Sequence, residues 1–196
     1  MRLFHAPHCG SQAAAIVINE LGLACDIVRT NFSDRSELLK HNPQGKVPTL
    51  VLDNGQVLTE CAVVMQYLAD QKPEGGLLPR VGTWERYKTL EAVNFVATEI
   101  YQTLSVFWVK DISEETRTFH KAITTRKLEV LNSVLGRTPY LAGNQYTIAD
   151  IYCYVVVNWT KDLGLDMSRF PAILGYCERL ASRPAIARTV AADMAK

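Results

Sequence analysis

The stretch Asn42-Pro43-Gln44-Gly45-Lys46-Val47-Pro48-Thr49-Leu50, followed shortly by Thr59-Glu60-Cys61, decides the fold of this chain. Pro48 precedes a strand-like run, which is where a proline is tolerated because it cannot donate to the ladder of a sheet. If the Val47–Pro48 bond is cis, the turn leaves the N–H and C=O of Val47 free. Such groups can pair with an extended peptide by strand addition.

The residues after this stretch predict a hairpin and then a helix. Asp53-Asn54-Gly55 is typical of a turn that returns the chain through Gln56-Val57-Leu58. Thr59 is the expected N-cap of the next helix, with Glu60 and Cys61 in its first turn. The unpaired N–H groups of a helix start favour a carboxylate. The sequence therefore predicts that a small acidic peptide binds here.

Secondary-structure signals continue on both sides of this region. Arg2–His5 and Cys25–Arg29 are expected strands, and the run from Ser11 has helical spacing that stops at Gly22. A short helix over Ser36–Lys40 and a longer one from Thr59 to Asp70 complete the order β-α-β-α-β-β-α. Two parallel strands joined through a helix and followed by an antiparallel hairpin predict a thioredoxin-like domain.

The second half of the chain is predicted to be all-helical. Residues 72–82 are rich in proline and glycine and form the expected linker. Long helices are expected over Thr83–Val109 and from a cap at Ser113 to Gly136, and shorter ones after Pro171 and Pro184. Thr147-Ile148-Ala149-Asp150 has the pattern of a capping box, and the apolar helix that it opens is the expected centre of this domain.

Composition excludes several classes of protein. The chain has 196 residues, 48% of them hydrophobic, and a net charge of +1, which gives no argument for nucleic acid or a charged membrane surface. No apolar run approaches the ~20 residues that cross a bilayer. Five cysteines without CxxC spacing indicate neither a disulfide framework nor a metal site. We therefore expect a reduced, cytoplasmic protein.

The stretch NPQGKVPTL, the hairpin and TEC together resemble the glutathione-binding half of cytosolic glutathione S-transferases, most closely the bacterial beta class. The resemblance covers nearly the whole chain, from Arg2 through the Thr147–Asp150 box to Arg183-Pro184. It implies a thioredoxin-like domain at 1–71, a linker at 72–82 and an all-helical domain at 83–196. It also implies a homodimer with glutathione as co-substrate and no separate cofactor.

The resemblance also implies roles for individual residues. Val47, before Pro48, would pair with the cysteinyl backbone of glutathione, and Glu60 would accept from its γ-glutamyl ammonium. Cys61, where many relatives carry serine, would meet the adjacent carboxylate. Further residues are expected around the ligand: Glu99 and, from the neighbouring subunit, Asn94 at the glutathione site, Arg35 as a surface cation that could reach the glycyl carboxylate, and Tyr101, Phe107 and Trp108 in the electrophile pocket.

The residue that activates the glutathione sulfur is left open between two candidates. Beta-class enzymes align without gaps to Gly22, and their cysteine then falls on Gly10, whereas the thiol here is Cys9 and Ser11 is retained. A helix start would lower the pKa of Cys9, which favours it for disulfide chemistry. Ser11 is the second candidate, for conjugation, although it is also the expected N-cap. His5 and His8 are weaker candidates.

Two other functions compete with conjugation. One is a glutathione-dependent thiol transferase or peroxidase, in which Cys9 forms a mixed disulfide. The other is a non-catalytic protein of the same fold that binds apolar ligands or a partner, because fold alone does not fix function. The intact Val47, Pro48 and Glu60 favour retained glutathione binding, so the leading hypothesis is a glutathione transferase that acts on small apolar electrophiles.

Overall fold

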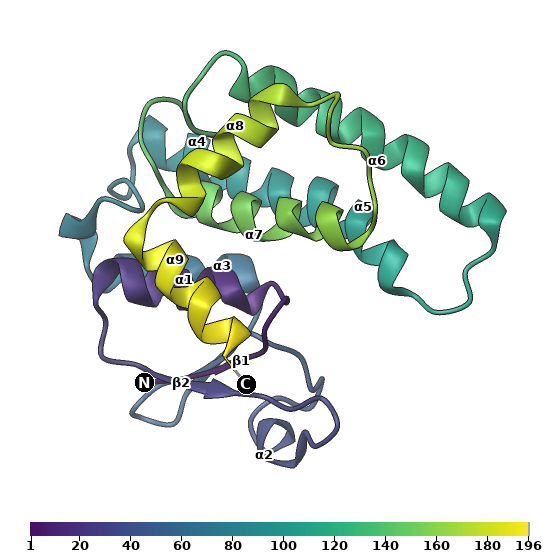
Figure 1. Ribbon diagram of the computed structural model, residues 1–196. Coiled ribbons are helices and arrows are strands. Elements are labelled where there is room, and N and C mark those ends of the chain that lie inside the picture. Colours follow the sequence, from purple (N-terminus) through teal and green to yellow (C-terminus); the bar gives the residue numbers. More distant parts are fainter. Residues whose placement is uncertain (196) are drawn as a thin grey trace. The chain divides into compact units, whose positions relative to one another are not determined.

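Four strands of the N-terminal half form one mixed sheet in the computed structural model, which describes residues 1–195 (Figure 1). They are β1 (Arg2–His5), β2 (Asp26–Arg29), β3 (Thr49–Val51) and β4 (Val57–Leu58), in the spatial order β2-β1-β3-β4. β2 is parallel to β1, and β3 is antiparallel to both β1 and β4. The predicted fold class, a thioredoxin-like sheet followed by a helical half, is confirmed.

Strand alternation decides which helix covers which face of the sheet. Phe4 of β1 points to the face of the short helix α2 (Ser36–Leu39), where its ring lies 5.4 Å from that of His41. Leu3 and His5 therefore point to the opposite face. That face is covered by α1 (Ser11–Leu21) and α3 (Cys61–Asp70), whose buried apolar residues form the core of this half.

The last helix, α9 (Pro184–Met194), packs against α1 on this same face. Residues from Ser182 onward therefore form one compact unit with Met1–Leu78, whereas the sequence had placed them with the helical domain. The reason is a series of polar contacts along α1. Arg183 pairs with Glu20 at 2.8 Å, and the amide of Asn19 donates to Thr189 at 2.8 Å.

The second unit, Pro79–Ala181, is helical throughout. Its main helices are α4 (Trp84–Phe95), α5 (Tyr101–Ser105), α6 (Glu114–Leu135), α7 (Ile148–Asp162) and α8 (Pro171–Ala181). α7 is almost entirely buried and packs against α4, α5 and α8, as its apolar sequence predicted. The unit boundary after Leu78 lies inside the expected linker, which contains one 3₁₀ turn, η1 (Pro73–Gly75).

The continuous helix predicted over Thr83–Val109 is wrong in its second half. After α4 the chain forms a π-helical segment, η2 (Val96–Ile100), then α5, then a 3₁₀ turn, η3 (Val106–Trp108). Neither proline nor glycine lies in this region. The threonines Thr98 and Thr103 donate their hydroxyls back to backbone carbonyls, a contact that bends helices.

Helix ends show which capping predictions hold. The capping box of Thr147 and Asp150 is confirmed, as are the cap at Ser113 and the left-handed stop at Gly22. Two expected caps are wrong: Gly10, not Ser11, is the N-cap of α1, and Glu60, not Thr59, is that of α3. In neither case does a side chain cap the helix, so backbone geometry alone sets the start.

Two further findings on the described residues concern membrane-spanning helices and metal-binding clusters. No helix within residues 1–195 is both long and apolar enough to span a membrane. The same residues hold no cluster of three or more histidine, cysteine, aspartate or glutamate side chains that could bind a metal ion.

Candidate functional site

A buried asparagine organises the loop that carries Val47. Asn42 is only 4% exposed, and its amide donates to the carbonyl of Lys46 at 3.0 Å and to Thr49 Oγ1 at 2.9 Å. The hydroxyl of Thr49 donates to the same carbonyl at 2.8 Å. These contacts close the loop upon itself immediately before β3. They fix the backbone on both sides of Val47, which is what a binding edge requires.

Val47 presents an open backbone edge. The Val47–Pro48 bond is cis, as the sequence suggested. Within the described part of the chain, no backbone hydrogen bond uses the N–H or the C=O of Val47. The side chain of Val47 is half-buried, and Pro48 and Thr49 behind it are buried. An extended peptide could therefore add to this edge through both backbone groups of Val47.

Glu60 stands exposed at the start of α3. Its backbone has φ 66° and ψ 113°, a left-handed conformation that is uncommon for a residue with a side chain. The carbonyl of Glu60 accepts from Val63 and Val64 as the helix begins, and its side chain makes no capping bond. The exposed carboxylate is therefore not used to cap α3, and it lies at a place where the helix dipole is positive.

The starts of α1 and α3 meet through Cys61. Its thiol donates to the carbonyl of Gly10 at 3.1 Å, so the first turn of α3 is tied to the N-cap of α1. This contact gives the cysteine a structural role that a serine hydroxyl could also fill. It also places Cys61 and Gly10, and with Gly10 its chain neighbour Cys9, in one region of the first unit.

Cys9 and Ser11 lie in different environments. Cys9 is half-buried, and burial, followed by the nearby carboxylate of Asp193, raises the pKa of its thiol. The expectation of a lowered pKa is therefore wrong, because burial of the Cys9 thiol raises it. Ser11 has no solvent exposure, and its Oγ accepts from the backbone N–H of Ala6 at 3.1 Å. His8, with φ 57°, is exposed in the turn between them and β1.

Arg35 lies beside the Val47 loop. Its guanidinium donates to the carbonyl of Gly45 at 3.2 Å and lies 4.7 Å from the ring centre of Phe32. Gly45 has φ 61°, a left-handed conformation that favours glycine. The exposed Arg35 therefore supports the loop from outside, in addition to offering a surface charge.

The remaining predicted residues lie in the second unit. Asn94 is exposed on α4, and Glu99, in η2, forms an ion pair with Lys127 of α6. Tyr101 packs edge-on against Trp159 with ring centres 5.0 Å apart. Phe107 lies beneath Arg117, whereas Trp108 is 51% exposed. Tyr101 thus belongs to an aromatic cluster with Trp159 and Tyr152, both of which are buried.

Comparison with known proteins identifies the family. Models of the N-terminal and C-terminal domains of glutathione S-transferase match residues 3–76 and 96–184. The chain is 32% identical over 198 residues to glutathione S-transferase GstA of Escherichia coli O157:H7, and the match covers 98% of each chain. This chain belongs to the glutathione S-transferase family.

Solved glutathione S-transferases share the fold closely. A sphingomonad glutathione S-transferase complexed with glutathione matches over 100% of both chains, with 32% identity and a TM-score of 0.96. A bacterial beta-class glutathione S-transferase from Sphingomonas chungbukensis matches over 99% of each chain, with 34% identity and a TM-score of 0.94. The expected resemblance to the beta class is therefore confirmed.

One polar pair near the start of α1, His5 and Asp193, was only partly visible in the sequence. His5 was a weak candidate, and Asp193 was not a candidate at all, yet the two side chains are 2.7 Å apart. They are 188 positions apart in the chain, and α9 carries no motif that singles out Asp193. The signal in the sequence was His5 itself, a histidine directly after the apolar residues Leu3 and Phe4 of the strand.

Proposed function

We propose that this protein conjugates the thiolate of glutathione to small apolar electrophiles. The observation that carries the proposal is the open backbone edge at Val47, in one unit with the exposed carboxylate of Glu60. A γ-glutamyl tripeptide has the matching groups: an extended backbone for the edge and an ammonium for the carboxylate. The relative solved with bound glutathione supports the same ligand.

The proposal assigns roles around that edge. Val47, presented by cis-Pro48, pairs with the cysteinyl backbone, Glu60 accepts from the ammonium, and the start of α3 at Cys61 receives the carboxylate. Arg35 supports the loop and adds positive charge. Glu99, and Asn94 from the neighbouring subunit, complete the glutathione site, and Tyr101, Phe107 and Trp108 contribute apolar surface for the electrophile. No cofactor beyond glutathione takes part, and we place the protein in the cytoplasm.

Two activities assayed side by side test this function. Conjugation of glutathione to 1-chloro-2,4-dinitrobenzene is followed in parallel with reduction of a mixed disulfide by glutathione. We expect saturable conjugation that exceeds the disulfide activity. Disulfide reduction without conjugation would replace the proposal with a thiol transferase, and the absence of both activities would favour a binding protein.

Replacing Cys9 with alanine should leave conjugation within about tenfold of the wild type, a barrier change of ~1.4 kcal/mol. The reason is the raised pKa of Cys9, which keeps it a neutral thiol at pH 7. Such a thiol can donate a weak hydrogen bond to the glutathione sulfur but is a poor nucleophile. Any disulfide reduction by the wild type should be lost in this variant by orders of magnitude.

The matched control for Cys9→Ala is Cys25→Ala. Cys25 is another half-buried thiol of the same unit whose pKa is also raised by burial. It lies beside β2, away from the start of α1. Loss of conjugation by a hundredfold or more in Cys9→Ala alone would make Cys9 the activating group and contradict this assignment.

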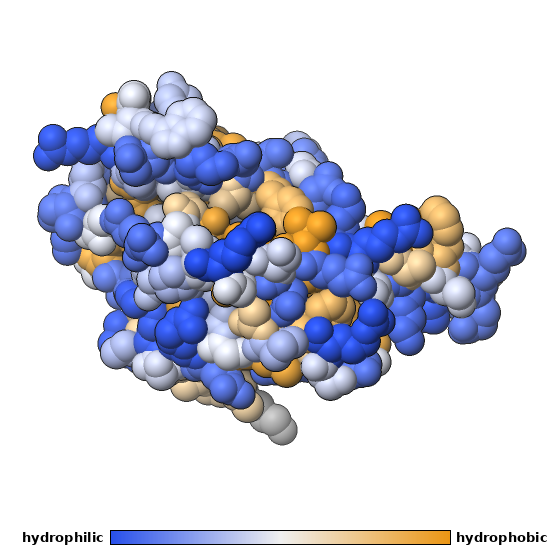
Figure 2. All heavy atoms as spheres, turned by 90° about the horizontal axis from the view of Figure 1, so that it is seen from above, coloured by the Kyte–Doolittle hydropathy of each residue, from blue (hydrophilic) through white to orange (hydrophobic). Residues whose placement is uncertain are grey.

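We also propose that the protein is a homodimer joined through α4 and α6. A groove of about 270 Å³ lies between these helices and is lined by Ala92, Phe95, Val130 and Val134, among others. Trp84 and Tyr87, 71% and 59% exposed, lie one helical turn before groove residues of α4. On the face seen in Figure 2, apolar side chains form separate orange areas among hydrophilic ones. A second copy of the chain could cover Trp84, Tyr87 and the groove.

Sedimentation should show a dimer at micromolar concentration, and Tyr87→Glu should shift it toward monomer by placing a charge in the interface. Phe119→Glu is the control, because Phe119 is 62% exposed on α6 and does not line the groove. A wild-type protein that sediments as a stable monomer would refute the dimer.

A further inference from the structure

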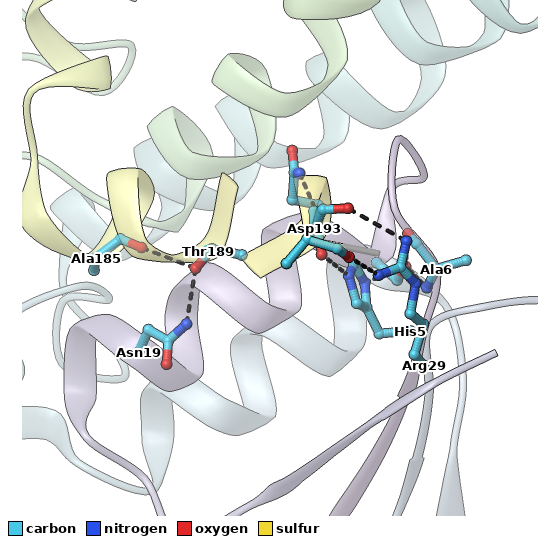
Figure 3. A network of polar contacts seen from close by, with 10 residues as sticks. His5, Ala6, Asn19, Arg29, Ala185, Thr189 and Asp193 are labelled. Carbon is cyan, nitrogen blue, oxygen red and sulfur yellow. Dashed lines mark hydrogen bonds and ion pairs between the residues drawn. The ribbon is translucent and has the colours of Figure 1, made fainter. Parts of the chain in front are cut away.

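The carboxylate of Asp193, in α9, contacts His5, the last residue of β1. In Figure 3, Asp193 in the last turn of α9 lies against His5, and its Oδ1 is 2.7 Å from His5 Nε2. Its other oxygen, Oδ2, accepts from the side-chain amide of Gln12 at 2.6 Å. The side chains of His5 and Asp193 are 4% and 9% exposed, so this contact is shielded from water.

The other side of the imidazole contacts the start of α1. His5 Nδ1 lies 2.9 Å from Ser11 Oγ, which also accepts from the backbone N–H of Ala6. Three side chains thus connect α9 to the turn between β1 and α1. That turn carries Cys9 and Gly10, and the carbonyl of Gly10 receives the thiol of Cys61.

Hydrogen-bond roles in this chain follow from the charge of Asp193. Burial alone would raise the pKa of Asp193, but hydrogen bonds from His5 and Gln12, with the charges of His5 and Arg29, lower it overall. An ionised carboxylate only accepts, so His5 Nε2 must carry a proton. When Nε2 carries the only ring proton, Nδ1 can accept from the hydroxyl of Ser11, whose other acceptor is the carbonyl of Ala6 at 3.3 Å; both acceptors lie inside the protein.

We propose that Asp193 is a positioning residue for the glutathione site, acting through His5 to direct the Ser11 proton inward and to hold the Ala6–Gly10 turn. The inference rests on the proposed function. Ser11 then supports the turn from inside the protein, and its proton is not available to the glutathione sulfur. The sulfur instead meets the outer side of the turn, where Cys9 lies.

Packing of α9 alone cannot give this effect, because its contacts differ along its length. Thr189 is joined to Asn19, and Arg183 to Glu20, in the second half of α1. The contacts of Asp193, in the last turn of α9, instead involve the residues on either side of the β1–α1 turn, His5 and Gln12. If α9 only stabilised this unit, the loss of any of its polar contacts should affect catalysis equally. A positioning role predicts that the loss of the Asp193 contacts has the larger effect on catalysis.

Asp193→Asn and Thr189→Val separate these two roles. Both variants alter one α9 side chain that makes two hydrogen bonds, at nearly constant side-chain volume, and both should lower the melting temperature. In Asp193→Asn we expect kcat for conjugation to fall about tenfold or more, with KM for glutathione changed less than threefold, because Val47 and Glu60 still bind the ligand. In Thr189→Val both constants should stay within about twofold, and Asp193→Glu should recover part of kcat.

A second readout needs no turnover. In ¹⁵N NMR spectra of the wild type, His5 should carry a proton on Nε2, and Asp193→Asn should shift the amide resonances of residues 8–10 more than Thr189→Val does. Equal kcat in the two variants, or a His5 protonated on Nδ1, would overturn the inference. A wild type without conjugation but with the expected spectra would overturn the proposed function and leave the link from Asp193 to the turn standing.

Discussion

Replacing Asp150 with alanine should lower the free energy of unfolding by about 3–5 kcal/mol, the largest effect that we expect on stability. Asp150 has no solvent exposure. Its Oδ1 accepts from the N–H of Leu141 and the hydroxyl of Tyr176, and its Oδ2 from the N–H of Thr147. Alanine would take this acceptor from the N–H groups of Leu141 and Thr147, each at a cost of about 1–3 kcal/mol, and would leave the hydroxyl of Tyr176 only the backbone carbonyl of residue 150, at 3.3 Å.

Chemical denaturation followed by circular dichroism measures this effect. Asp150→Asn keeps the volume and one acceptor oxygen, so its loss should be intermediate. Asp162→Ala, an exposed carboxylate at the end of the same helix, should change stability by less than about 0.5 kcal/mol. Asp150→Ala within about 1 kcal/mol of the wild type would show that the capping network does not stabilise the helical unit.

The largest effect on ligand binding is expected for Glu60→Ala, which should weaken glutathione binding by about 1.5–3 kcal/mol, the usual contribution of a hydrogen bond to a charged group. Glu60 is exposed and its carboxylate is not used to cap α3, so it is available to the γ-glutamyl ammonium. Alanine keeps a Cβ at φ 66°, and the backbone strain at this position is therefore nearly unchanged.

Titration calorimetry with glutathione measures the loss in Glu60→Ala. Glu74→Ala is the matched control, because Glu74 is an exposed carboxylate of the same unit in the turn η1. We expect its affinity to equal that of the wild type. A folded Glu60→Ala protein with unchanged affinity would remove Glu60 from the site.

Local signals explain how much of the fold could be predicted. Three predicted features each involve residues only a few positions apart, so the sequence shows all of their members: the hairpin at Asn54-Gly55, the helix stop at Gly22 and the capping box at Thr147 and Asp150. The Val47 edge was predictable for the same reason. The resemblance to glutathione S-transferases then placed these elements in one fold, which the comparisons confirmed.

The predictions that were wrong depend on contacts between distant residues or on small differences in backbone geometry. The contact between His5 and Asp193 joins opposite ends of the chain, and with it α9 joins the first unit. The π-helical segment at Val96–Ile100 departs from an α-helix only in its hydrogen-bond register, which apolar spacing does not reveal. The pKa of Cys9 was misjudged because burial, which raises it, depends on tertiary packing.

An electron-density map of crystals soaked in glutathione tests directly whether glutathione binds along the Val47 edge. Our account predicts the cysteinyl backbone of glutathione paired with the N–H and C=O of Val47, and the γ-glutamyl ammonium within hydrogen-bond distance of Glu60. It also predicts the sulfur beside the turn that carries Cys9. Glutathione bound elsewhere, with the Val47 edge unoccupied at saturating concentration, would contradict it.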